Sequence, residues 1–165
     1  MSQQTQEFLV FELNGMNFSI PLSTVEEVVP SNVITAIPNS PEFLLGLSAV
    51  RGKVLGVIDA ARRYGMKPGT RGYFMVCLVR GNLTAVTIDR PVLAGFMSFR
   101  MLDKAEIASL PLDGTFNKKF ITGAFELLEK VDDSGATRPT GTFCVQVDPD
   151  LFVSAEMASK IGEVA

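Results

Sequence analysis

The feature that most constrains the fold is an internal repeat, because the second half of the chain follows the pattern of the first. The apolar run Phe74–Val79 matches Phe8–Leu13, and Gly81 falls where Gly15 does. The Asn-Gly pair that ends at Gly15 is typical of a two-residue hairpin turn, so each run is expected to pair with the segment that follows it. These returning strands are expected over Met16–Leu22 and Leu83–Ile88.

The repeat continues further along the chain. Gly141–Asp148 and Gly52–Asp59 each contain a glycine, an apolar run and an aspartate at the same spacing. Both aspartates are suited to capping a helical turn, and Pro149 is favoured at a first helical position. Two related halves of short strands, separated by Gly and Pro, predict two small β-barrels packed together. A groove at their junction is where a ligand or active site would be expected.

The stretch Gly46–Tyr64 combines a strand, a charge and a helical turn. The β-branched run Val54–Ile58 favours a mostly buried strand, but Arg51 and a glycine interrupt the apolar sequence just before it. Burying an unpaired guanidinium is costly, so we expect Arg51 near a strand end, pointing into solvent or a groove. Asp59 then caps a short helix that stops at Gly65.

Three further elements are expected in and just after the first half. Ser23 with Glu26 three residues later is a capping-box pattern, which predicts a short helix that ends before Pro30. A strand is expected over Val33–Ile37. Residues 66–73, which contain Pro and two Gly, are the best candidate for a linker.

The second half is expected to differ from the first in three places. Pro91–Phe96 contains Pro and Gly, so a long helix is not expected there, and a strand should follow over Met97–Met101. An inserted loop is expected over Lys130–Thr140. Ser154–Gly162 is expected to form a short helix at the C-terminus.

Composition argues against several classes of function. The 165-residue chain has a net charge of −3 and scattered basic residues, so it has no electrostatic footprint for nucleic acid. It has no histidine, which removes the commonest general base and metal ligand. Cys77 and Cys144 lie in apolar runs and are expected to be reduced core thiols. The N-terminus is polar and no apolar run approaches the ~20 residues of a membrane span, so we expect a cytoplasmic protein with no membrane insertion. We also expect neither a cofactor nor a metal.

These motifs, in this order, resemble the CheW-like domain of bacterial chemotaxis adaptors over nearly the whole chain. The most specific part reads Phe43, Gly46, Arg51, Gly52, Val54–Ile58, Asp59, Arg62 and Arg63. The resemblance implies a mainly β fold of two packed five-stranded SH3-like barrels with a few short helices. It implies one domain over residues 7–153, with halves near 7–65 and 73–153 that can exchange strands, and a short helix or tail over 154–165.

The resemblance also implies a non-enzymatic scaffold. Such a protein links the cytoplasmic tip of methyl-accepting chemoreceptors to the regulatory domain of a CheA-type histidine kinase. It is recruited to membrane receptor arrays through these partners, in flagellar chemotaxis or in type IV pilus (twitching) motility. The residues implied to lie at partner surfaces are Arg51, Gly52, Gly46, Val25, Glu27, Val28 and Phe43.

Purely structural interpretations of these residues stay open beside the partner-binding one. Val25, Val28 and Phe43 would also suit core packing, and Arg51 could be a solvated strand-end charge. Ala49 stands where the family usually has Asn, two residues before the arginine. The alternative function is a small-ligand-binding or enzymatic domain that uses the groove between the barrels.

Overall fold

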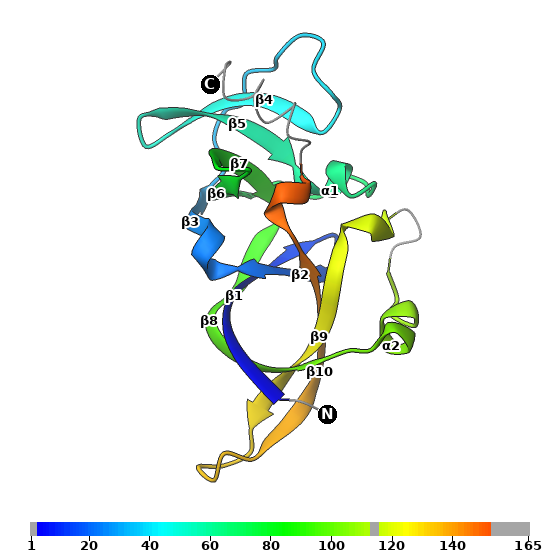
Figure 1. The fold of residues 1–165 in the computed structure, drawn as a ribbon. Coiled ribbons are helices and arrows are strands. Elements are labelled where there is room, and N and C mark those ends of the chain that lie inside the picture. Colours follow the sequence, from blue (N-terminus) through cyan, green and yellow to red (C-terminus); the bar gives the residue numbers. More distant parts are fainter. Residues whose placement is uncertain (1–2, 113–115, 153–165) are drawn as a thin grey trace.

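The computed structural model describes residues 3–112 and 116–152, and it contains two five-stranded β units (Figure 1). The first is a closed barrel in the order β1-β2-β10-β9-β8. Its strands are β1 (Gln3–Leu13), β2 (Met16–Pro21), β8 (Arg90–Met101), β9 (Ile121–Lys130) and β10 (Thr137–Val147). The helix expected over Ser154–Gly162 lies outside the described residues.

The second unit is a five-stranded sheet in the order β3-β6-β7-β5-β4. Its strands are β3 (Val25–Pro30), β4 (Leu44–Val50), β5 (Lys53–Asp59), β6 (Tyr73–Val79) and β7 (Asn82–Ile88). The expected mainly β architecture is confirmed. However, the ladders of this sheet leave β3 and β4 as its edges, and an isolated bridge between Thr35 and Leu47 spans part of the gap.

Each unit contains strands from both halves of the sequence. The β1–β2 hairpin joins β8, β9 and β10, whereas the β6–β7 hairpin joins β3, β4 and β5. The joins are parallel pairs, with Phe18 beside Val145 in the first unit and Ile58 beside Val86 in the second. Each hairpin therefore completes a sheet that begins in the other half of the chain.

Three hairpins turn on two residues that both have positive φ. The φ angles are 51° and 78° at Asn14 and Gly15, 46° and 78° at Arg51 and Gly52, and 48° and 79° at Arg80 and Gly81. Positive φ at both positions matches the twist of the flanking strands, and glycine adopts it without steric cost. The expected hairpins are confirmed, and Arg51 lies at a strand end as predicted.

The helix expected after Ser23 is wrong. Leu22–Thr24 form one 3-10 turn, η1, which has no side-chain cap, and the chain then continues as β3. Valines favour a pleated strand, and β3 pairs antiparallel with β6 along its length. Val25, Glu27 and Val28 therefore lie on a strand.

The strand expected over Val33–Ile37 is also wrong. Within it only Thr35 pairs, through two backbone hydrogen bonds of 2.8 Å with Leu47. The Ser48 hydroxyl donates to the Val33 carbonyl oxygen at 2.7 Å. A side chain thus satisfies a backbone group that a β-ladder would otherwise use.

The second half also departs from the expected elements. β8 is longer than the predicted strand Met97–Met101, because it includes Pro91–Phe96 as well. The loop predicted over Lys130–Thr140 is shorter, because β10 already begins at Thr137. A short helix, α2 (Lys104–Ala108), begins at a complete capping box that the sequence analysis did not identify.

Both predicted aspartate caps are confirmed. Asp59 accepts a hydrogen bond from the backbone N–H three residues later, at 3.4 Å, where α1 (Ala60–Arg63) begins. Asp148 accepts one from the N–H two residues later, at 2.9 Å, where η3 (Pro149–Leu151) begins. Residues 66–72 have no regular secondary structure, as expected of a linker.

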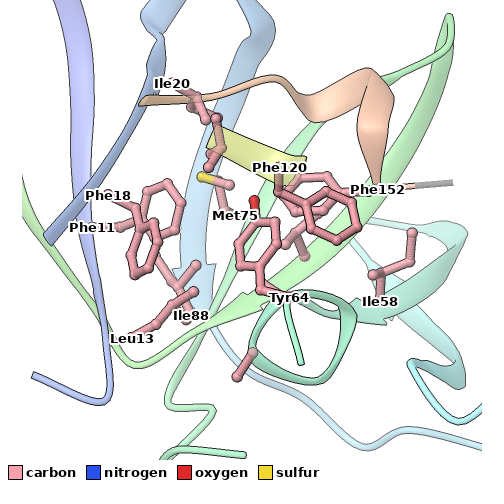
Figure 2. Packing of buried hydrophobic residues seen from close by; sticks show 14 of the residues in the cluster. Phe11, Leu13, Phe18, Ile20, Ile58, Tyr64, Met75, Ile88, Phe120 and Phe152 are labelled. Carbon is pink, nitrogen blue, oxygen red and sulfur yellow. The ribbon is translucent and has the colours of Figure 1, made fainter. Parts of the chain in front are cut away.

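The largest cluster of buried side chains lies between the two units (Figure 2). Tyr64 is central to it, with its ring centroid 5.7 Å from Phe18, 5.5 Å from Phe116, 5.1 Å from Phe120 and 5.4 Å from Phe152. The first unit also contributes Phe11 and Ile20, and the second contributes Ile58, Met75 and Ile88. The junction where a groove was expected is therefore filled by packed side chains.

Each unit also has a smaller apolar cluster of its own. The first unit contains Phe8, Val10, Phe99, Phe125, Leu127 and Cys144. The second contains Val50, Leu55, Val57, Phe74, Val76 and Ala85, with the partly buried Val29 packed against them. This second cluster supports the β3 and β4 edges from behind.

Candidate protein-interaction site

Arg51 and Glu27 form an ion pair at the edge of the second sheet. Arg51 is at the tip of the β4–β5 hairpin and its side chain is 72% exposed, whereas Glu27 on β3 is 24% exposed. The Arg51 Nε lies 2.6 Å from the Glu27 Oε2. Both residues are among those predicted to lie at partner surfaces, and the fold brings them together from positions 24 residues apart.

A pocket of about 210 Å³ lies between the ends of β3 and β4. We call it the edge pocket; it is lined by Val29, Pro30, Ser31, Asn32, Ala49, Val50 and Arg51. The Asn32 side-chain amide donates to the Ala49 carbonyl oxygen at 3.1 Å and links its two sides. Val29 and Val50 also belong to the apolar cluster of the second sheet, so the pocket is backed by the core.

Three apolar residues form a row beside the edge pocket. Ala49 is opposite Val54 in the β4–β5 register, and extending the Thr35–Leu47 bridge by two residues places Val33 opposite Ala49. Val33 is 80% exposed and Val54 is 50% exposed. Grouped exposed apolar side chains of this kind mark interaction surfaces. We call these three residues the apolar row.

The apolar row was not predicted from the sequence. Val54 was placed in a mostly buried strand, and residues 55–59 are buried, but Val54 lies at the exposed start of β5 beside the hairpin turn. No local signal marked Val33, because the long-range bridge at Thr35 sets its register.

The two predicted site glycines have structural roles. A Cβ added at Gly52 would have open space around it, and the residue adopts a φ of 78° in the hairpin turn beside Arg51. Gly46 is buried with a φ of 145°, and an added Cβ would lie 2.0 Å from the Thr35 carbonyl oxygen. Gly46 therefore permits the close approach of the segment that carries Val33.

The remaining predicted site residues lie against the core. Val25, Val28 and Phe43 are partly buried and pack on the large cluster between the units. The Arg63 guanidinium carbon lies 4.6 Å from the centre of the Phe43 ring. Because these side chains contact the core, their positions favour core packing, and the exposed part of the predicted site is centred on Arg51.

A buried ion pair holds the linker against the second sheet. The Asp59 side chain is 1% exposed, and its Oδ2 accepts a hydrogen bond from the Arg71 Nε at 2.7 Å. The Thr87 hydroxyl donates to the other carboxylate oxygen at 3.4 Å. Sequence reasoning identified Asp59 as a cap but gave no signal for Arg71, which lies in the linker.

Few groups suited to catalysis are accessible in the described part of the chain. Residues 3–112 and 116–152 contain no cluster of three or more His, Cys, Asp or Glu that could hold a metal ion. Burial raises the pKa of Cys77 and of Cys144 to about 12, so neither thiol is a nucleophile at neutral pH. None of the helices described is long and apolar enough to cross a membrane.

Comparison with known proteins identifies the family. The model of the CheW-like domain matches residues 7–153, which include nearly all of both units. The chain belongs to the CheW-like domain family. The solved CheW-like structure of the scaffolding protein TtCheW from Thermoanaerobacter tengcongensis has a TM-score of 0.63 with this chain at 22% identity, covering 92% of this chain and 90% of that one.

Two relatives are similar to this chain over half of its length or more, and one of them is named for chemotaxis. The probable chemotaxis protein CheW of Rhizobium etli is 33% identical over 92 residues, which are 54% of this chain and 59% of that protein. FrzA of Myxococcus xanthus is 26% identical over 124 residues, 73% of this chain and 74% of that protein. The match to the first therefore spans less than two thirds of its length.

Proposed function

We propose that this CheW-like domain is a non-enzymatic scaffold that couples chemoreceptors to a CheA-type histidine kinase. The observation that carries the proposal is the family match over residues 7–153, which spans both units rather than one motif. The relative named for chemotaxis, together with FrzA, supports signalling to a flagellar or a pilus motor. In this proposal the protein acts in the cytoplasm and reaches membrane receptor arrays through its partners.

The receptor-facing surface is proposed to be the edge of the second sheet. Arg51 offers an exposed guanidinium on a short, well-defined hairpin, and the apolar row provides area that a partner can bury. Glu27 orients Arg51, and Gly52 shapes its turn. Gly46, Val25, Val28 and Phe43 support this edge from the inside.

The kinase regulatory domain is proposed to bind a different surface, on the first barrel. Phe96 on β8 is 74% exposed and Leu93 is 48% exposed, so this barrel also has apolar side chains available to a partner. Separate surfaces allow both partners to bind at once. The scaffold then contributes geometry, and the kinase responds if the receptor states differ in how well they engage the complex.

The alternative function, a small-ligand or active site between the barrels, requires free space at their junction. The space between the two units holds the aromatic cluster around Tyr64, whose members are between 0% and 5% exposed (Figure 2). A ligand would have to displace this core. The scaffold is therefore the better proposal.

Co-sedimentation with receptor-containing membranes and purified kinase tests the scaffold proposal. Arg51→Glu is expected to weaken recovery with the receptor membranes while leaving the fold intact. Arg138→Glu is the matched control, because Arg138 is 66% exposed and pairs with Glu129 at 2.6 Å, on another hairpin. If the wild-type chain binds neither receptor nor kinase, the proposed function is wrong.

A further inference from the structure

One arginine of the first barrel is shared between two carboxylates from different elements. The Arg100 side chain on β8 is 17% exposed, and its two terminal nitrogens donate to the two carboxylate oxygens of Glu106 on α2, at 3.1 and 2.9 Å. One of these nitrogens also donates to the Glu126 Oε1 on β9 at 3.2 Å. Glu126 is buried, and its other oxygen accepts a hydrogen bond from the Gly141 backbone N–H at 3.1 Å. The cluster therefore has two negative charges and one positive charge.

The segment that carries Glu106 is anchored at its two ends. α2 lies on the outside of the first barrel and buries none of its own side chains (Figure 1). With five residues it is too short to be a stable helix by itself in water. Just before it, Leu102 is buried and its N–H donates to the Ala124 carbonyl oxygen at 3.0 Å. Just after it, Leu110 packs on the large cluster between the units. We call residues 103–109, between these two leucines, the flap.

We infer that the flap is a conformational switch, which closes and opens as Glu106 competes with Glu126 for Arg100. When the flap is closed, the guanidinium is divided between the two carboxylates. When the flap is open, Arg100 pairs with Glu126 alone and Glu106 is hydrated. Breaking a buried ion pair is costly chiefly because it leaves a charge without a partner. Opening the flap leaves no such charge, so the closed and open states are close in free energy.

The flap gives the first barrel two alternative surfaces. In the closed state, Glu106 covers the Arg100 guanidinium, and in the open state the guanidinium is accessible beside β8. A partner that binds one of these states more tightly than the other shifts the equilibrium toward it. The switch involves only residues of the first barrel and of α2, so it does not depend on the proposed function or on the Arg51 edge.

Amide hydrogen exchange measured by NMR tests the switch, because competition predicts opposite effects for the two carboxylates. The reporters are the Ile107 and Ser109 amides, which are hydrogen-bonded within α2. Glu106→Gln removes the ion pair with Arg100 but keeps an acceptor for the capping box, since glutamine also suits that position. Exchange at the reporters is expected to rise about fivefold or more. Glu126→Gln leaves Arg100 to Glu106 alone, so exchange at the reporters is expected to fall about twofold or more.

Glu129→Gln is the matched control for these two variants. Glu129 lies on the same strand as Glu126, but its side chain is 49% exposed and pairs with Arg138 at 2.6 Å. This variant should leave exchange at the reporters unchanged. Amides in the β9–β10 ladder are measured in the same spectra and report any general loss of stability, so a local change in the flap is recognised as such.

Salt dependence gives a second readout that needs no change at the buried Glu126. Raising NaCl from about 0.05 M to about 0.5 M screens the Arg100–Glu106 pair. Exchange at the reporters should therefore rise in the wild-type chain, relative to the β9–β10 amides, and this response should be lost in Glu106→Gln. Faster exchange in both Glu106→Gln and Glu126→Gln would show that the two carboxylates cooperate, which would overturn the inference. Exchange in the wild-type flap that does not respond to salt would overturn it as well.

Discussion

Replacing Arg71 should destabilise the protein much more than replacing an exposed arginine of the same kind. Removing one partner from a buried ion pair costs about 3–5 kcal/mol, because the other charge is left uncompensated. The Asp59 side chain is 1% exposed. The Arg71 side chain is 32% exposed, so solvent screening reduces the expected loss for Arg71→Met to about 2 kcal/mol.

Urea unfolding followed by circular dichroism measures this loss, and a thermal scan should show a fall in Tm of about 4–8 °C. The control is Arg90→Met, because Arg90 is 57% exposed and pairs with Glu12 at 2.8 Å. An exposed pair of this kind contributes less than about 1 kcal/mol. Equal losses in the two variants would show that Asp59 does not depend on Arg71 and would refute the linker attachment.

Two other substitutions test the core and the edge. Tyr64→Phe should leave the free energy of unfolding unchanged or raise it by up to about 1 kcal/mol. The reason is that the buried Tyr64 hydroxyl has no hydrogen-bond partner among the described residues. A clearly lower free energy of unfolding in urea would contradict this. Gly46→Ala should cost at least about 2 kcal/mol more than Gly52→Ala, since only the Gly46 Cβ would meet backbone, 2.0 Å away. Similar unfolding midpoints for the two alanine variants would be the contrary result.

Features with a local chemical cause could be predicted from the sequence. The Asn14-Gly15 hairpin and the Asp59 and Asp148 caps depend on residues that are adjacent or two to three apart in the chain. The exposure of Arg51 followed from the cost of burying an unpaired guanidinium. The repeat then supplied the architecture, because similar local patterns in both halves predict similar strands.

Features that depend on a distant partner could not be predicted. Ser23 and Glu26 satisfy a capping-box pattern, but pairing with β6 draws the following residues into a strand. Arg71 gave no signal because its partner Asp59 is 12 residues away and is already explained as a cap. The apolar row likewise depends on the bridge at Thr35, and no periodicity in the sequence marks that bridge.

The exchange of hairpins between the halves explains how a small protein can hold Arg51 in a defined position. β5, which leads away from the Arg51 hairpin, pairs with β7 from the second half of the chain. β3, which carries Glu27, pairs with β6 from the same hairpin. The two members of the ion pair are therefore aligned by one β6–β7 hairpin, which also contributes Met75 and Ile88 to the core between the units. A partner that binds this edge is thus positioned relative to the first barrel through a continuous packed core, which is the rigidity that the proposed scaffold between two partners requires.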